Sequence, residues 1–151
     1  MSFSAIAPFV RAVTGGDAPK SASHGKYTAM DTQRILIVDD NRDSAISLSM
    51  MMNLTGYETA TAFDGFEAVG VATQFDPHVV LLDIGLPRLN GYEVCRVLRR
   101  MPRAKPFVIV ALTGWGQDED RRKSFDAGFD AHLVKPVDPD TLLRTLRELT
   151  R

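Results

Sequence analysis

Short apolar runs alternate with amphipathic segments from residue 33 onward. Five segments predict strands, at residues 35–38, 57–61, 78–82, 107–112 and 131–134. Most of them are continuous runs of branched apolar side chains, which are typical of strands buried on both faces of a sheet. The segment 57–61 is more polar and therefore predicts a strand nearer an edge of the sheet.

A segment with helical periodicity follows each predicted strand. We expect helices at residues 41–54, 64–73, 91–100, 118–127 and 138–149. The pair Asp64 and Glu67 has the spacing of a capping box, and Asp138 before Pro139 has the pattern of a helix start. Five strand–helix pairs predict an α/β fold, a doubly wound parallel sheet with helices on both faces. Our choice for its strand order is 2-1-3-4-5, with ligands at the carboxyl ends of the strands.

The composition changes near residue 30 of the 151 residues. Residues 1–30 hold three basic side chains and one acidic side chain, a net charge of 3 − 1 = +2, and 14–26 is rich in turn-forming residues. We expect residues 1–30 to be an N-terminal tail or linker, either disordered or carrying a short amphipathic turn that docks on a partner. The remainder, 31–151, is long enough for one globular domain.

Charge and cysteine content exclude several classes of function. The 18 Lys and Arg residues nearly balance the 19 Asp and Glu residues, so we expect no direct contact with nucleic acid. The single cysteine, Cys95, can form neither a disulfide framework nor a thiolate zinc cage. No apolar run is long enough to span a membrane, and we expect a cytoplasmic protein. Only two residues follow the last predicted helix, so we expect no effector or DNA-binding domain in this chain.

Polar side chains mark the carboxyl ends of four predicted strands. Asp39 and Asp40 follow the first, Asp83 the third, Thr113 the fourth and Lys135 the fifth. In a parallel sheet these ends lie along one edge, so we expect the side chains to converge in one crevice. Clustered carboxylates suit Mg²⁺ or Mn²⁺, while a lysine and a hydroxyl beside them suit a phosphoryl group. Taken singly, the acidic pair after the first strand could equally be a helix cap.

Four motifs, in this order and spacing, resemble the bacterial response-regulator receiver domain. They are 35–41, 82–87 followed by Asn90-Gly91, 111–114 and 134–136. The resemblance covers about 33–150 and implies a chemotaxis-regulator-like, flavodoxin-like (βα)5 fold.

The resemblance implies a role for each acidic residue. Asp83 would accept a phosphoryl group from a phosphohistidine on a sensor histidine kinase or a histidine phosphotransfer protein. Asp40 would bind Mg²⁺ directly and Asp39 through water, while the backbone carbonyl of Gly85 and the Asp83 carboxylate would complete the metal site.

The resemblance also implies how the phosphoryl group is held and read. Thr113 and Gly114 would bind it, Lys135 would form an ion pair with it, and the Lys135–Pro136 peptide would be cis. Phosphorylation would then reshape the face formed by the fourth helix, the fifth strand and the fifth helix, which would contact a downstream protein.

Two positions depart from the family pattern. His132 stands where the family has a phenylalanine or tyrosine that moves with the switch; it is either an ordinary strand residue or a cause of weakened or pH-dependent switching. Trp115 either shields the phosphoryl group from water or covers an apolar or partner-contacting surface.

We interpret the chain as a receiver module and not as a turnover enzyme, either a stand-alone regulator or the receiver of a hybrid kinase. The rival from the enzyme class is a haloacid-dehalogenase-type phosphatase, which also uses an aspartate nucleophile and Mg²⁺. Its acidic pair follows the nucleophile, whereas Asp39 and Asp40 precede Asp83. A third alternative is a scaffold receiver that is not phosphorylated, but all four site positions are intact.

Overall fold

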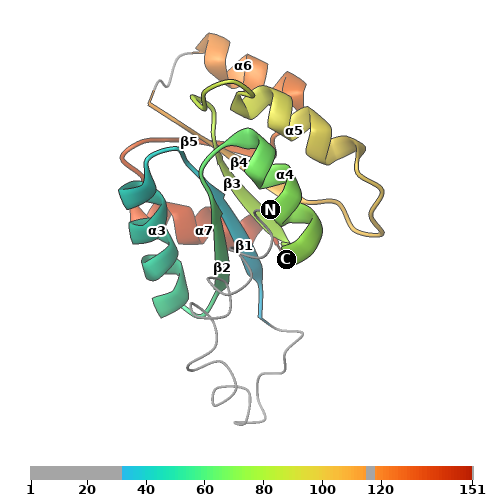
Figure 1. Ribbon diagram of the computed structural model, residues 1–151. Coiled ribbons are helices and arrows are strands. Elements are labelled where there is room, and N and C mark those ends of the chain that lie inside the picture. Colours follow the sequence, from blue (N-terminus) through green and yellow to red (C-terminus); the bar gives the residue numbers. More distant parts are fainter. Residues whose placement is uncertain (1–31, 115–117, 151) are drawn as a thin grey trace.

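The computed structural model describes residues 32–114 and 118–150, and these residues form a three-layer α/β domain (Figure 1). Its five strands are parallel and lie in the order β2-β1-β3-β4-β5, as predicted. The strands are β1 Arg34–Val38, β2 Glu58–Ala62, β3 Val79–Asp83, β4 Val108–Thr113 and β5 Ala131–Val134. The helices are α3 Arg42–Leu54, α4 Gly65–Phe75, α5 Gly91–Arg100, α6 Asp118–Ala127 and α7 Pro139–Leu149.

Each face of the sheet is covered by its own set of helices. Alternate strand residues such as Leu36 and Val38 join a core with side chains of α4, α5 and α6. Their neighbours Ile35 and Ile37 join a second core with side chains of α3 and α7. The central strands are therefore buried on both faces, and the polar residues that follow them lie at the rim of the sheet.

Side chains at the helix starts cap the first turns. The carboxylate of Asp64 accepts a hydrogen bond from the backbone N–H of Glu67 at 2.8 Å, as expected at the start of α4. The return half of the predicted capping box is different, because Glu67 accepts from the N–H of Phe63 at 2.7 Å. A complete capping box occurs instead at α5, between Asn90 and Glu93.

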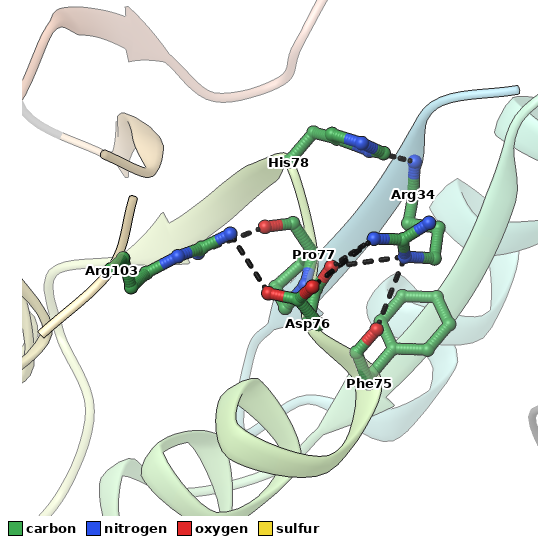
Figure 2. A network of polar contacts seen from close by, with 6 residues as sticks. All are labelled: Arg34, Phe75, Asp76, Pro77, His78 and Arg103. Carbon is green, nitrogen blue, oxygen red and sulfur yellow. Dashed lines mark hydrogen bonds and ion pairs between the residues drawn. The ribbon is translucent and has the colours of Figure 1, made fainter. Parts of the chain in front are cut away.

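A network of polar contacts joins several segments at the amino-terminal end of the sheet, where β1 and β3 begin (Figure 2). Arg34 donates to the carbonyl of Asp76 at 2.7 Å, and Arg103 donates to the Asp76 carboxylate at 2.9 Å. Nδ1 of His78 accepts from the backbone N–H of Arg34 at 2.9 Å. These contacts join α4, β1, β3 and the segment after α5 at the end of the sheet opposite to Asp83.

Two expectations concern residues outside the described ranges, namely the N-terminal tail over 1–30 and the role of Trp115. The boundary at residue 30 therefore stays a prediction. Within the described part of the chain, no helix is both long enough and apolar enough to cross a membrane.

Candidate functional site

Three carboxylates gather at the carboxyl ends of β1 and β3. The two strands are neighbours in parallel register, with Val38 opposite Leu82, so the residues that follow these two meet at one edge. One carboxylate oxygen from each of Asp39, Asp40 and Asp83 lies within 4.8 Å of the others. Asp39 and Asp83 are buried, whereas Asp40 is exposed. The structure thus brings together the acidic residues that the sequence pattern placed in one crevice.

Lys135 connects two of these carboxylates. Its Nζ lies 3.0 Å from Oδ2 of Asp39 and 2.9 Å from Oδ2 of Asp83. Lys135 follows β5, two strands away from β3, and its long side chain spans the intervening rim. The ammonium group neutralises part of the negative charge that the crevice concentrates.

Burial and ion pairing change the ionisation of this cluster. Burial raises the pKa of Asp39, although the N–H of Asn41 and the ammonium of Lys135 both favour its charged form. Burial alone would lower the pKa of Lys135, but its hydrogen bonds to Asp83 and Asp39 outweigh burial and raise that pKa. Lys135 is therefore a fixed positive charge at neutral pH, and Asp39 carries a charge that the fold only partly stabilises.

The donor set of the crevice fits a hard divalent cation. It offers carboxylate oxygens from three residues with no histidine or cysteine among them, which suits Mg²⁺ better than zinc or copper. Gly85 lies on the exposed turn directly after Asp83, and its N–H donates to Oδ1 of Asp83 at 2.9 Å. This hydrogen bond ties the turn to the carboxylate group.

Thr113 and Lys135 border the crevice on the side of β4 and β5. Thr113 is buried, ends β4 and pairs with Val134, while its carbonyl accepts from the N–H of Lys135 at 2.7 Å. The Lys135–Pro136 peptide is cis, as expected. Gly114 follows as an exposed residue, and an added Cβ there would meet nothing within 4 Å.

Gly91, at the start of α5, packs closely against the main chain of Asp83. It begins α5, and its N–H donates to the carbonyl of Ile84 at 3.0 Å. An ideal Cβ on Gly91 would lie 2.6 Å from the carbonyl oxygen of Asp83. Only glycine allows this close approach. The motif Asn90-Gly91 was noted in the sequence, but the contact with Asp83 was not foreseen.

His132 lies half-buried on β5, opposite Ala111 of β4. Its Nδ1 is 3.0 Å from Oγ of Ser124 on α6, while Nε2 is buried and has no hydrogen-bond partner among the residues that the structure describes. The side chain therefore links β5 to α6 beneath the site.

Comparisons of the sequence and of the structure with known proteins point to one and the same protein family. The family model described as the response regulator receiver domain matches residues 35–147. The chain is 39% identical over 120 residues to the DNA-binding dual master transcriptional regulator RpaA of a Synechocystis strain, covering 78% of this chain and 49% of that protein. It is 37% identical over 124 residues to the transcriptional regulatory protein PrrA of Mycobacterium tuberculosis, covering 82% and 52%. The chain thus spans about half the length of these curated relatives.

Solved structures show the same architecture. The chemotaxis protein CheY4 of Vibrio cholerae superposes with a TM-score of 0.74 at 31% identity, covering 78% of this chain and 98% of that one. The receiver domain of sensor histidine kinase PA1611 from Pseudomonas aeruginosa gives 0.71 at 31% identity, covering 78% and 97%, and its structure has a magnesium ion coordinated in the active-site cleft.

The expectation that nucleic acid is not a partner is wrong as stated. The Synechocystis relative is named as DNA-binding, and those from Mycobacterium tuberculosis and other mycobacteria are named as transcriptional regulators or response regulators. Net charge did not predict this because it describes only the 151 residues of this chain, whereas these relatives are about twice as long as the segment that they share with it. A balanced charge on a receiver domain therefore says nothing about whether the protein it belongs to contacts DNA.

Proposed function

This chain belongs to the response regulator receiver domain family, whose members act as phosphoacceptors in two-component signalling, and we propose that Asp83 is its phosphoacceptor. The observation that supports this assignment is the position of its carboxylate. It ends the central strand β3, lies within 4.8 Å of the other two site carboxylates and is contacted by Lys135 at 2.9 Å. Asp39 belongs to the same carboxylate set and also contacts Lys135, at 3.0 Å, but its side chain is 6% exposed against 13% for Asp83, so Asp83 is the more accessible of the two to an incoming phosphoryl group.

The proposed reaction transfers a phosphoryl group from a phosphohistidine. A carboxylate oxygen of Asp83 forms a bond to phosphorus while the bond from phosphorus to the histidine nitrogen breaks, and the imidazole leaves with that electron pair. Each chain accepts one phosphoryl group, so the protein is a stoichiometric acceptor and not a turnover enzyme on free substrates.

Asp39, Asp40 and the carbonyl of Gly85 would hold Mg²⁺ together with Asp83. When bound, the ion supplies positive charge beside the oxygens of the phosphoryl group. Thr113 and the N–H of Gly114 donate hydrogen bonds to these oxygens, and Lys135 exchanges an Asp83 oxygen for a phosphoryl oxygen. Each of these residues neutralises or orients the group without exchanging a proton with it.

Phosphorylation then biases the domain between two states, because the new charge changes which partners Thr113 and Lys135 can hold. A cytoplasmic location agrees with this role and is part of the proposal. The curated relatives are about twice as long as the segment that they share with this chain, so their output functions are not carried over to it.

The test is intact-mass analysis after incubation with acetyl phosphate and Mg²⁺. We expect one added phosphoryl group per chain, lost when Mg²⁺ is chelated before the reaction. Asp83→Asn should remain unmodified, while the matched control Asp126→Asn, on the exposed face of α6, should be modified like the parent. Modification of Asp83→Asn would contradict the assignment, and repeated turnover of a free phosphate ester would favour the phosphatase alternative instead.

A further inference from the structure

The turn region 63–66, which joins β2 to α4 and includes the first two residues of that helix, receives two arginine side chains from other parts of the chain. The guanidinium carbon of Arg42 lies 4.1 Å from the centre of the Phe63 ring. The guanidinium carbon of Arg88 lies 5.6 Å from the centre of the Phe66 ring, and Nη2 of Arg88 is 3.3 Å from Oδ2 of Asp64. Both distances to the rings are within the range of a cation–π interaction.

Each arginine belongs to a segment that we assign to the metal site. Arg42 comes two residues after Asp40, and Arg88 comes three residues after Gly85. The first segment follows β1 and the second follows β3, so they reach the proposed metal site from different strands. The turn region 63–66 therefore contacts both the segment that contains Asp40 and the segment that contains Gly85.

Backbone contacts place the turn firmly beside both segments. The N–H of Asp39 donates to the carbonyl of Ala62 at 3.1 Å, directly before the turn. On the other side, an ideal Cβ on Gly65 would lie 2.6 Å from the carbonyl oxygen of Leu89. The turn is thus packed against the main chain on both sides, and the arginines add side-chain anchors to these contacts.

The backbone of Arg88 adopts a conformation that is unusual for a residue with a side chain. Its φ of +64° lies in the left-handed region, which is unfavourable for a residue with a Cβ. Glycine would adopt this conformation without strain. The Arg88 side chain is 68% exposed, so its contacts with Asp64 and Phe66 lie at the surface of the domain.

We propose that Arg42 and Arg88 are positioning residues for the metal site, an inference that rests on the function proposed above. By anchoring on Phe63, Asp64 and Phe66 they fix the distance between the segment of Asp40 and the segment of Gly85. Mg²⁺ requires nearly ideal octahedral geometry and short bonds, so its affinity depends on that distance. Loosening either anchor lowers the affinity for Mg²⁺ even though neither arginine touches the ion.

Charge makes the sign of the effect informative. Removal of a cation near three carboxylates strengthens Mg²⁺ binding if the arginine acts only through its charge. Removal of an anchor weakens Mg²⁺ binding if the arginine positions the loop. Arg88→Met therefore separates the two explanations by the direction of the change, and Phe63→Leu and Phe66→Leu remove an anchor with no change in charge.

The experiment is calorimetric titration of the full chain with Mg²⁺, together with urea unfolding of every variant. We expect Phe63→Leu, Phe66→Leu and Arg88→Met each to raise the Kd for Mg²⁺ by about 2- to 5-fold, the loss of one cation–π contact. Phe66 is 62% exposed, so its replacement leaves the core intact. The control Arg100→Met removes an exposed arginine about 14 Å along α5 from Gly91 and should leave the Kd unchanged.

An unchanged Kd in both phenylalanine variants, or a lower Kd in Arg88→Met, would overturn the inference. If that happens while Asp40→Asn abolishes binding, the proposed metal site stands and only the positioning role fails. If the parent protein binds no Mg²⁺, or if Asp40→Asn binds as the parent does, the proposed metal site itself fails and the inference fails with it.

Discussion

Gly91→Ala should separate the stability of the domain from its ability to be phosphorylated. Gly91 begins α5 and faces the main chain of Asp83. The added Cβ would lie 2.6 Å from the carbonyl oxygen of Asp83 and 2.6 Å from Cα of Ile84. Ordinary contacts are about 3.5 Å, so the first turn of α5 and the main chain of Asp83, the proposed phosphoacceptor, must separate by about 0.9 Å.

This displacement has a modest effect on folding and a larger one on chemistry. Overpacking of this size costs about 1–3 kcal/mol, and the better helix propensity of alanine returns up to about 1 kcal/mol, so we expect a net loss between about 0 and 3 kcal/mol. A displacement near 1 Å of a reacting group lowers reaction rates by up to about 100-fold. We therefore expect phosphorylation of Gly91→Ala to be about 10- to 100-fold slower while the protein stays folded.

The assay measures the rate of modification by acetyl phosphate at saturating Mg²⁺, with urea unfolding in parallel. Gly56→Ala is the matched control, because Gly56 has a φ of +101° and nothing lies within 4 Å of its added Cβ. The added side chain strains the backbone at the end of the sheet opposite to Asp83. The free energy of unfolding of Gly56→Ala should therefore fall by about 1–2 kcal/mol, while its rate of phosphorylation stays at the parental value. A folded Gly91→Ala protein that reacts as fast as Gly56→Ala would refute the reasoning.

Three further predictions concern side chains away from the carboxylates. Burial, followed by the charge of Arg34, lowers the pKa of His78, so the unfolded chain binds more protons than the folded chain as the pH falls below about 6.5. The free energy of unfolding should therefore fall on acidification. Urea titrations from pH 8 to pH 5 should show a smaller decline in the His78→Asn variant than in the parent protein. Burial raises the pKa of the Cys95 thiol to about 11, so iodoacetamide at pH 8 should label it only in denaturant, and labelling of the native protein at the rate of a free thiol would contradict this. His132→Phe removes the buried, unpaired Nε2 but also the contact between Nδ1 and Ser124. The free energy of unfolding of this variant should therefore equal the parental value or exceed it by about 1 kcal/mol. A loss above about 1 kcal/mol in urea unfolding would show that the Ser124 contact contributes more to stability than the unpaired Nε2 costs.

The sequence allowed the acidic crevice to be predicted because only strand ends were needed. Asp39 and Asp83 lie at the ends of apolar runs that are typical of buried parallel strands, and parallel strands end at one edge of the sheet. The strand order 2-1-3-4-5 then makes these two strands neighbours. Lys135 could be assigned to the same edge, but not its simultaneous contact with both carboxylates, since that depends on the conformation of a long side chain. Chain direction and strand order thus determine which residues meet, and side-chain packing determines how.

Other features of the site depend on contacts that no local pattern encodes. Arg88 reaches Asp64 across 24 positions of the chain, and its positive φ is unusual for any residue other than glycine or asparagine. The capping box was expected at Asp64, where the spacing to Glu67 is right, yet the Glu67 side chain bonds to Phe63. Spacing alone cannot decide which of two neighbouring backbone N–H groups, that of Phe63 or that of Asp64, donates to the Glu67 carboxylate.

The two ends of the sheet have opposite energetic roles. At the carboxyl end, burial raises the pKa of Asp39, so holding this carboxylate in its charged form costs free energy that Lys135 only partly offsets. At the amino end, the carbonyl of Asp76 accepts from Arg34 and its carboxylate accepts from Arg103, so both acceptor groups of Asp76 find partners within the domain (Figure 2). A binding cation should therefore stabilise the domain through the carboxyl end, and the free energy of unfolding should rise with Mg²⁺ concentration as RT ln(1 + [Mg²⁺]/Kd). Because Asp40→Asn removes a proposed Mg²⁺ ligand but none of the amino-end contacts, it should abolish that dependence while preserving the cooperative unfolding transition.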